Sequence, residues 1–519
     1  MPAGLPSPPV PPGRALSEGD RRRRAPRAAA PAALSALAAA LLLAGCGHGP
    51  GAETFTRDML MDPEACATCH PDHVKEWSSS MHAYAADDPV FVAMNARGQR
   101  ETKGALGTFC LDCHAPLAVR AGAATGGVLS ASTPQKLRGV TCYFCHSVDK
   151  VKGTHDDPLE LASDGVLRGG FTGPVPNGAH ASAYAPLLDR ESPASASLCG
   201  SCHDIVSPAG GHIERTFAEW QGTVFSHGST ALPCGQCHMA GRDGPAAQDP
   251  AATTAAPTRR VHEHTFPGVD VALTSFPAAA AQKAQIQAAL DTTLQGEICV
   301  KGQSSLGNAT LQIVLDNVGA GHSWPSGATQ DRRAWVEVIA YAKGQILYQS
   351  GAVPDGASVT AMADPDLWLI RDCMFDAHGK QAAMFWSAAS VESNLLPGPT
   401  TIVPTDPAFY LTHVVRTFPR PTSIPPSLAT FPDRVTMRVR LVPVGLDVLD
   451  DLIQSGDLDP AVKSKMPAFT LEGTRLEWTP ASVTLKYLEG GIPVACVSAG
   501  LSTGASSAHP APEHSLCKP

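Results

Sequence analysis

The sequence lacks an excess of positive charge, because its formal net charge is −9 over 519 residues. A nucleic-acid-binding chain normally carries a clustered basic surface, so this net charge argues against a nucleic-acid partner. It does not indicate any other kind of partner. Long apolar runs are also scarce. The best candidate, residues 28–43, is too short and too rich in alanine for a membrane span. Residues 66–238 contain few long periodic apolar runs, which leaves little material for a conventional hydrophobic core.

One short motif, Cys-x-x-Cys-His, is instead abundant and occurs five times. With 15 Cys and 19 His in the chain, roughly 0.02 matches are expected by chance. Two thiols at this spacing can add to the vinyl groups of one haem, and the adjacent histidine can bind its iron. The motifs therefore predict five c-type haems. The predicted thioether ligands are Cys66, Cys69, Cys110, Cys113, Cys142, Cys145, Cys199, Cys202, Cys234 and Cys237, and the predicted proximal ligands are His70, His114, His146, His203 and His238.

Zinc knuckles and redox dithiols are the alternative interpretations of the motifs. Zinc sites rarely place a histidine directly after the second cysteine five times over. A haem core would also explain how residues 66–238 form an interior, with the porphyrins packed against each other and short helices and loops wrapped around them. Haem is therefore the preferred cofactor.

The N-terminus has the pattern of an export signal. A basic block at residues 21–27 precedes the apolar stretch, which ends in Leu43-Ala44-Gly45-Cys46. The small residues before Cys46 resemble a bacterial lipobox, in which this cysteine is acylated. We therefore predict a lipoprotein-type signal peptide at 1–45 and a linker at 46–60. A membrane attachment through lipid on Cys46 would place the protein at the cell envelope, on the periplasmic or outer-membrane side. An ordinary cleaved signal peptide is the alternative.

Four cysteines remain after the haem motifs and the lipidation site are assigned. An even number of thiols in an oxidising compartment permits two disulfides with three possible connectivities, and free thiols are the alternative. The four residues are Cys299, Cys373, Cys496 and Cys517.

Composition changes near residue 270 and predicts a multidomain chain. Residues 61–270 would form a mainly helical, loop-rich pentahaem cytochrome c domain, 271–294 a linker with a helix at 278–287, and 295–519 an all-β, sandwich-like domain. A helix is also expected at 447–455, and a hairpin is expected to turn at Lys343-Gly344. The expected strands are 311–317, 335–341, 345–350, 435–442 and 483–487.

Four histidines are the best candidates for the second axial positions. Each lies either near Gly or Pro residues, which favour a close approach to iron, or shortly after a motif. They are His82, His180, His264 and His322. Methionine would give a higher potential than histidine, but Met81 and Met239 are poorly placed. The expected haems are therefore mostly bis-His and of low potential, and one could be five-coordinate. His73, His155, His212 and His227 compete for the remaining iron, whereas His48, His509 and His514 lie in the tails.

The order of the motifs resembles that of the multihaem cytochrome c family that includes cytochrome c-554 and, more distantly, hydroxylamine oxidoreductase. The resemblance covers about residues 66–270 and includes Trp77 and His82 after the first motif, together with the segments 139–146, 198–204, 216–220 and 234–239. It implies distal ligands at His82 and His180 and a later one at His264. The loop at 321–327 recurs in multihaem proteins with an appended β domain, which implies that this domain covers a haem.

Two departures limit what the resemblance implies. Cytochrome c-554 is a tetrahaem protein without a large β domain, so its partner does not carry over. Hydroxylamine oxidoreductase has more haems and a tyrosine-crosslinked catalytic haem, and no feature of this sequence identifies such a site.

Electron transfer between redox partner proteins is the function that these patterns favour. The alternative is an oxidoreductase that acts on a small nitrogen or sulfur oxyanion, or a hydroxylamine-type substrate, at one open haem. Arg259, Arg260, Arg332 and Arg333 could line such a pocket, and no catalytic residue is identified. A third hypothesis gives the β domain the role of docking a partner.

Overall fold

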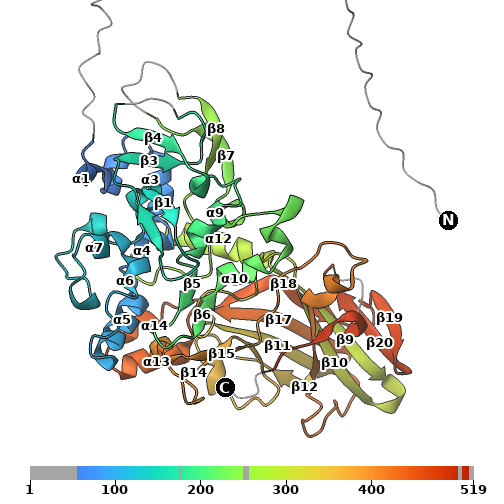
Figure 1. The fold of residues 1–519 in the computed structure, drawn as a ribbon. Coiled ribbons are helices and arrows are strands. Elements are labelled where there is room, and N and C mark those ends of the chain that lie inside the picture. Colours follow the sequence, from blue (N-terminus) through green and yellow to red (C-terminus); the bar gives the residue numbers. More distant parts are fainter. Residues whose placement is uncertain (1–54, 175–177, 249–255, 501–504, 514–519) are drawn as a thin grey trace, which may run out of the picture. The chain divides into compact units, whose positions relative to one another are not determined.

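The computed structural model describes residues 55–174, 178–248, 256–500 and 505–513. The predicted signal peptide, Cys46, His48, His514 and Cys517 lie outside these ranges. None of the helices within them combines the length and apolar composition that crossing a bilayer requires. The chain from Glu53 onward forms one compact unit, in which helices and short hairpins (blue to green in Figure 1) adjoin a large strand-rich region (yellow to red).

The N-terminal part of this unit is made of short helices. Most have four to eight residues, and α5 is the longest of them in this region. Several begin with proline in the first turn, where its missing N–H costs nothing and its fixed φ suits the helix; Pro63, Pro71, Pro89 and Pro116 are examples. The helices are α1 (Arg57–Leu60), α2 (Pro63–Cys66), α3 (Pro71–Ser78), α4 (Met81–Tyr84), α5 (Pro89–Glu101), α6 (Leu111–His114), α7 (Pro116–Arg120), α8 (Cys142–His146), α9 (Ser195–Gly200), α10 (Thr216–Gln221) and α11 (Cys234–His238).

Four two-stranded sheets lie between these helices, so the region is less purely helical than predicted. Three are antiparallel, and β3 with β4 is parallel. The pairs are β1 (Val148–Val151) with β2 (Leu159–Leu161), β3 (Val166–Gly169) with β4 (Ala181–Tyr184), β5 (Asp204–Val206) with β6 (His212–Arg215), and β7 (Gly241–Pro245) with β8 (Thr258–His262).

The strand-rich region follows helix α12 (Ala279–Asp291) and contains two large sheets. The six-stranded sheet has the order β19-β20-β9-β10-β16-β21, and the five-stranded sheet has the order β12-β11-β17-β18 with β13 beside β11. Their strands are β9 (Leu294–Gln303), β10 (Asn308–Asn317), β16 (His413–Phe418), β19 (Leu485–Glu489), β20 (Ile492–Ser498) and β21 (His509–Pro510), and β11 (Arg333–Ala342), β12 (Gln345–Ser350), β13 (Trp368–Ile370), β17 (Arg434–Val442) and β18 (Phe469–Trp478).

Both sheets contribute to one core of 30 buried residues. Alternate residues of β9 and β10, such as Ile298 and Ile313, meet alternate residues of β11 and β17, such as Val336 and Val439. This period of two is what a strand with one buried face requires. The sequence therefore supplies this region with an interior that does not depend on a cofactor.

Several predicted elements of the region match the structure. The strand expected at 345–350 is β12, and the hairpin before it turns at Lys343 and Gly344, with φ of 52° and 77°. The helices expected at 278–287 and 447–455 are α12 and α13 (Leu446–Gln454). The sequence did not predict β9, β13, β16, β18, β20 and β21, nor the small sheet of β14 (Asp372–Phe375) with β15 (Ser390–Ser393).

The structure contains a disulfide between Cys299 and Cys496, which joins β9 to β20 at directly opposed positions. Both side chains are fully buried. Cys373 is also disulfide-bonded. The prediction of disulfides among the four remaining cysteines is therefore confirmed for these three residues.

The N-terminal helices and the β region share buried surface. Val90 and Ala93 of α5 lie in one apolar cluster with Leu449 and Leu452 of α13. Salt bridges border this contact, among them Arg97 to Asp451 at 2.6 Å. The two regions are therefore held together by side chains as well as by the connecting chain.

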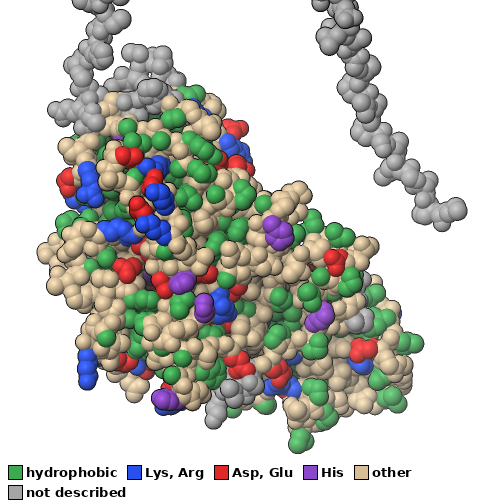
Figure 2. All heavy atoms as spheres, viewed as in Figure 1, with side chains coloured by type: hydrophobic (Ala, Val, Ile, Leu, Met, Phe, Trp, Pro, Cys, Tyr) green, Lys and Arg blue, Asp and Glu red, His purple; other side chains and the backbone are tan. Residues whose placement is uncertain are grey.

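Charges of both signs are mixed on the face that Figure 2 shows, where Lys and Arg side chains lie among Asp and Glu side chains. Ion pairs join side chains of opposite charge on the protein, for example Lys152 with Glu160 and Arg168 with Asp164.

Candidate functional site

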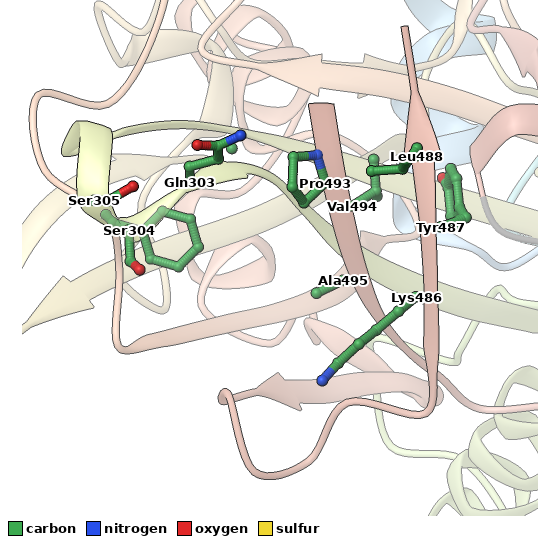
Figure 3. A pocket seen from close by; sticks show the side chains of 11 residues that line it. Gln303, Ser304, Ser305, Lys486, Tyr487, Leu488, Pro493, Val494 and Ala495 are labelled. Atoms are coloured by element: carbon green, nitrogen blue, oxygen red, sulfur yellow. The ribbon is translucent and has the colours of Figure 1, made fainter. Parts of the chain in front are cut away.

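A cavity of about 590 Å³ lies beside the β19–β20 hairpin and the turn Ser304–Leu306 (Figure 3). Its wall includes Gln303, Lys486, Tyr487 and Pro493. None of the five Cys-x-x-Cys-His motifs lines it, so this cavity is separate from the candidate haem ligands.

The second, third and fifth motifs lie on α6, α8 and α11, and the first and fourth lie on the turns that end α2 and α9. In three motifs the amide of the histidine donates to the carbonyl of the first cysteine four residues earlier. Residues four apart project from the same face of a helix, so the first thiol and the imidazole are presented on one side. The N···O distances are 2.8 Å for His70 to Cys66, 3.1 Å for His114 to Cys110 and 3.1 Å for His203 to Cys199.

Backbone carbonyls orient four of the five motif histidines. In each of them Nδ1–H donates to a carbonyl from a distant segment, which fixes the tautomer and leaves Nε2 free to bind a metal. The distances are 2.7 Å from His70 to Ala246, 3.0 Å from His114 to Ala85, 2.5 Å from His146 to Arg168 and 2.8 Å from His238 to Pro267.

Three motif histidines face a second histidine at nearly the same separation. The ring centroids are 6.4 Å apart for His70 and His180, 6.3 Å for His203 and His82, and 6.4 Å for His146 and His264. An imidazole nitrogen lies about 2 Å from a bound metal ion, so two rings on opposite sides of one ion have centroids about 6 Å apart. The three pairs therefore have the spacing of axial ligands, and each contains one of the predicted distal histidines.

Two of the distal candidates are oriented in the same way, by a hydrogen bond from Nδ1 to a backbone carbonyl. Nδ1 of His264 donates to the carbonyl of His262 at 2.9 Å, and Nδ1 of His322 donates to that of Ser323 at 2.7 Å. Burial lowers the pKa of His82 and of His264 to about 3 in each case. These imidazoles are therefore neutral at pH 7, which is the form that binds a metal.

His322, from the β region, lies among the motif histidines. Its pKa is lowered to about 4, first by burial and then by the neighbouring His238 and His203. Its loop contacts the N-terminal region directly, because Thr223 Oγ1 donates to the carbonyl of Gly321 at 3.2 Å. The structure thus brings the fourth predicted distal histidine to the fourth and fifth motifs.

His114 of the second motif has a different neighbour. The ring of Phe91 stacks on it at a centroid distance of 3.9 Å and an interplanar angle of 6°. Within the described residues, no histidine ring faces His114 at the separation of the three pairs. Nothing in the sequence indicates that Phe91 contacts a motif histidine.

Acidic groups surround the second motif. Asp270 lies near both His114 and Asp88, and Glu214 lies near Cys113. Burial raises the pKa of Glu214 to about 7 and that of Asp88 to about 6. These carboxyl groups can hold a proton close to neutral pH, and sequence reasoning missed them because isolated acidic residues show no pattern.

Of the other histidine candidates, His73 also faces a motif histidine, because its ring stacks on that of His70 at a centroid distance of 6.2 Å and an interplanar angle of 8°. His155 and His212 lie 6.4 Å from each other, and the exposed His227 bonds to Ser226. His73 contacts Glu76, and its ring lies 4.8 Å from that of His264. His73 therefore competes with His180 for the position opposite His70, whereas His155, His212 and His227 face no motif histidine in the part of the chain that the structure describes.

The four arginines suggested for an anion pocket are placed apart. Arg259 donates to the carbonyls of Thr172 and Gly173 beside β7 and β8. Arg332 and Arg333 are buried and pair with Asp270 and Asp447. Of the four, Arg332 is the one that lies near a motif histidine, His203.

Thiols of different motifs are close neighbours. Three pairs of interacting thiols connect the first motif to the third, the second to the fourth, and the fourth to the fifth. The pairs are Cys66 with Cys142, Cys113 with Cys202, and Cys199 with Cys234. Cys145 of the third motif also lies near Cys202 of the fourth, so the five motifs adjoin one another.

Adjoining Cys-x-x-Cys-His turns, with histidines opposed at axial-ligand spacing, fit covalently bound haem and are typical of multihaem c-type cytochromes. Comparison with known proteins supports this class. Residues 65–147 match the family model for cytochrome c554 and c-prime. No curated protein matches the chain.

A solved structure with the same fold is a penta-heme cytochrome c552 from Thermochromatium tepidum. It is 18% identical, with a TM-score of 0.53, and the match covers 81% of this chain and 99% of that chain. At this identity the likeness concerns the fold. The matched share is larger than residues 55–270 alone, so the common fold extends into the strand-rich region.

Proposed function

We propose that this protein is a pentahaem electron-transfer cytochrome in which four irons are held by two histidines each. The observation that carries the proposal is the near-constant 6.3–6.4 Å spacing of three histidine pairs, each joining a motif to a distant segment. The position of His322 near His238 supports a fourth pair. The proposed axial pairs are His70/His180, His82/His203, His146/His264 and His238/His322.

The chain's own residues would set the properties of these sites. A bound haem supplies a one-electron redox couple whose potential depends on its axial ligands and burial. The carbonyls of Ala246, Arg168 and Pro267 orient the proximal imidazoles, and the contiguous thiol pairs keep neighbouring sites close. Electrons would enter from and leave to redox partner proteins.

Mass spectrometry and electron paramagnetic resonance (EPR) of the purified holoprotein test this proposal. The mass should rise by five haems, and the colour should survive acid–acetone extraction because the thioether bonds are covalent. Four irons should be low-spin. Bound zinc, or colour lost on extraction, would refute haem attachment, and mostly high-spin iron would refute the histidine pairs.

A second candidate function is an oxidoreductase that acts on a small nitrogen or sulfur oxyanion, or a hydroxylamine-type substrate. The observation that favours it is the second motif, where Phe91 rather than a histidine contacts His114. Glu214 and Asp88 could hold protons there. The same EPR spectra decide between the candidates, since this function requires a fifth iron that is high-spin and binds cyanide. A fifth low-spin iron that is inert to cyanide would exclude it.

We also propose that the protein is exported and attached to the cell envelope by lipid on Cys46. The basic block and the apolar stretch that precede this cysteine support the proposal. A palmitate analogue should label the wild-type protein, and Cys46→Ala should remain unlabelled and be released in soluble form. An unlabelled, freely soluble wild-type protein would leave only an ordinary signal peptide.

A further inference from the structure

The loop at residues 321–327, which carries His322, is attached to helix α10 and the turn that follows it. At its beginning, Thr223 Oγ1 donates to the carbonyl of Gly321 at 3.2 Å. At its end, the amide of Gly327 donates to Thr216 Oγ1 at 3.1 Å. Because α10 lies between the fourth and fifth motifs in the chain, this attachment fixes the loop relative to both.

Glu219 of α10 is the charged group in this attachment. Ser326 Oγ donates to its Oε2 at 2.7 Å, and Ser326 Oγ also lies 2.8 Å from Thr216 Oγ1. Only 11% of the Glu219 side chain is exposed. A hydrogen bond to a buried carboxylate is stronger than a neutral one and is poorly replaced by water.

The β region holds the same loop from the opposite side. Asn317 Nδ2 donates to the carbonyl of His322 at 2.8 Å, and Arg332 Nε donates to that of Ser326 at 2.9 Å. A side chain at Gly398 would come within 3.0 Å of the His322 backbone. The loop is therefore confined between the two regions, and the bond between Ser326 and Glu219 is a side-chain link across their boundary.

We infer that Glu219 is a positioning residue for the imidazole of His322. By accepting the hydrogen bond of Ser326, it keeps the loop pressed on α10, so that His322 Nε2 remains on the side of His238. This inference rests on the proposed ligation by His322. A residue of the N-terminal region would then control the position of a ligand that the β region supplies.

Three single variants and one double variant of the holoprotein test the inference. Glu219→Leu and Ser326→Ala each remove the hydrogen bond, whereas Glu219→Gln keeps an oxygen that can accept it. In the first two, the fraction of one iron that is open to cyanide should rise roughly tenfold or more, which is the change expected for a lost bond to a carboxylate. Glu219→Gln should stay close to the wild type, and the double variant Glu219→Leu/Ser326→Ala should not exceed Glu219→Leu.

Glu160, a surface glutamate paired with Lys152, provides the matched control as Glu160→Leu. The inference is overturned if Glu219→Leu and Ser326→Ala both leave the cyanide-accessible fraction at its wild-type value, or if Glu160→Leu raises it equally. His322→Ala distinguishes a failure of the proposed ligation from a failure of the role of Glu219. If His322→Ala opens no iron, the proposed ligation is wrong; if it does and the other variants do not, only the role of Glu219 is wrong.

Discussion

Replacing His322 with alanine is expected to turn one iron of the five from low-spin to high-spin and to leave the others unchanged. His322 is buried near His238, and its Nδ1 is engaged with Ser323, so Nε2 is the atom available to iron. Alanine keeps the loop backbone but removes the ligand. EPR spectroscopy and absorption spectra should record the change, and added cyanide or imidazole should bind the opened iron.

His227 offers a matched control for this variant. It lies close to α10 in the sequence, but its side chain is exposed and bonds to Ser226. His227→Ala should therefore preserve all the low-spin signals. Unchanged spectra in His322→Ala, or equal changes in the two variants, would show that the β region supplies no axial ligand.

The residues of the site were predictable because covalent haem attachment demands a strict local spacing. Cys66, Cys69 and His70 must lie within one turn. This requirement appears in the sequence as a fixed spacing over only five residues. The distal histidines carried a weaker signal, from neighbouring Gly and Pro residues and from the family resemblance. Their pairing with particular motifs was not predictable, since His70 and His180 are brought together by the fold and not by spacing.

Other parts of the site had no signal in the sequence. The carbonyls of Ala246 and Pro267 orient proximal histidines, but any residue offers a carbonyl, so only the fold reveals this role. The contact of Phe91 with His114 and the placement of Glu214 near Cys113 likewise depend on tertiary structure.

The missed strands have a physical explanation. In β18 the alternation that begins with Phe469 and Leu471 is interrupted at Gly473, where the pairing with β17 shifts its register, and β9 contains Gly296 and Glu297, which reduce its apparent β propensity. Both strands are stabilised by burial against the opposite sheet, which local propensity does not report. β12, by contrast, follows a turn at Lys343-Gly344 that marks a hairpin in the sequence itself.

The chain produced without covalent haem is expected to lose the fold of residues 55–270 while the β region stays folded. The largest apolar cluster confined to the N-terminal region contains nine buried residues, against 30 in the core of the two sheets. Most of its helices are far shorter than the roughly 12–15 residues that an isolated helix needs to persist in water. The Cys299–Cys496 disulfide further restrains the sheets.

Hydrogen exchange and limited proteolysis of the holoprotein and apoprotein should reveal this difference. In the apoprotein, amides of α5 to α11 should exchange at rates near those of an unfolded chain, and cleavage should concentrate before α12. Strands β9, β11 and β17 should keep their protection. Helix α13 should become less protected than these strands, because its contact with α5 would be lost. Equal protection of residues 55–270 with and without haem would mean that the N-terminal region forms its own core, so that haem would not be its interior.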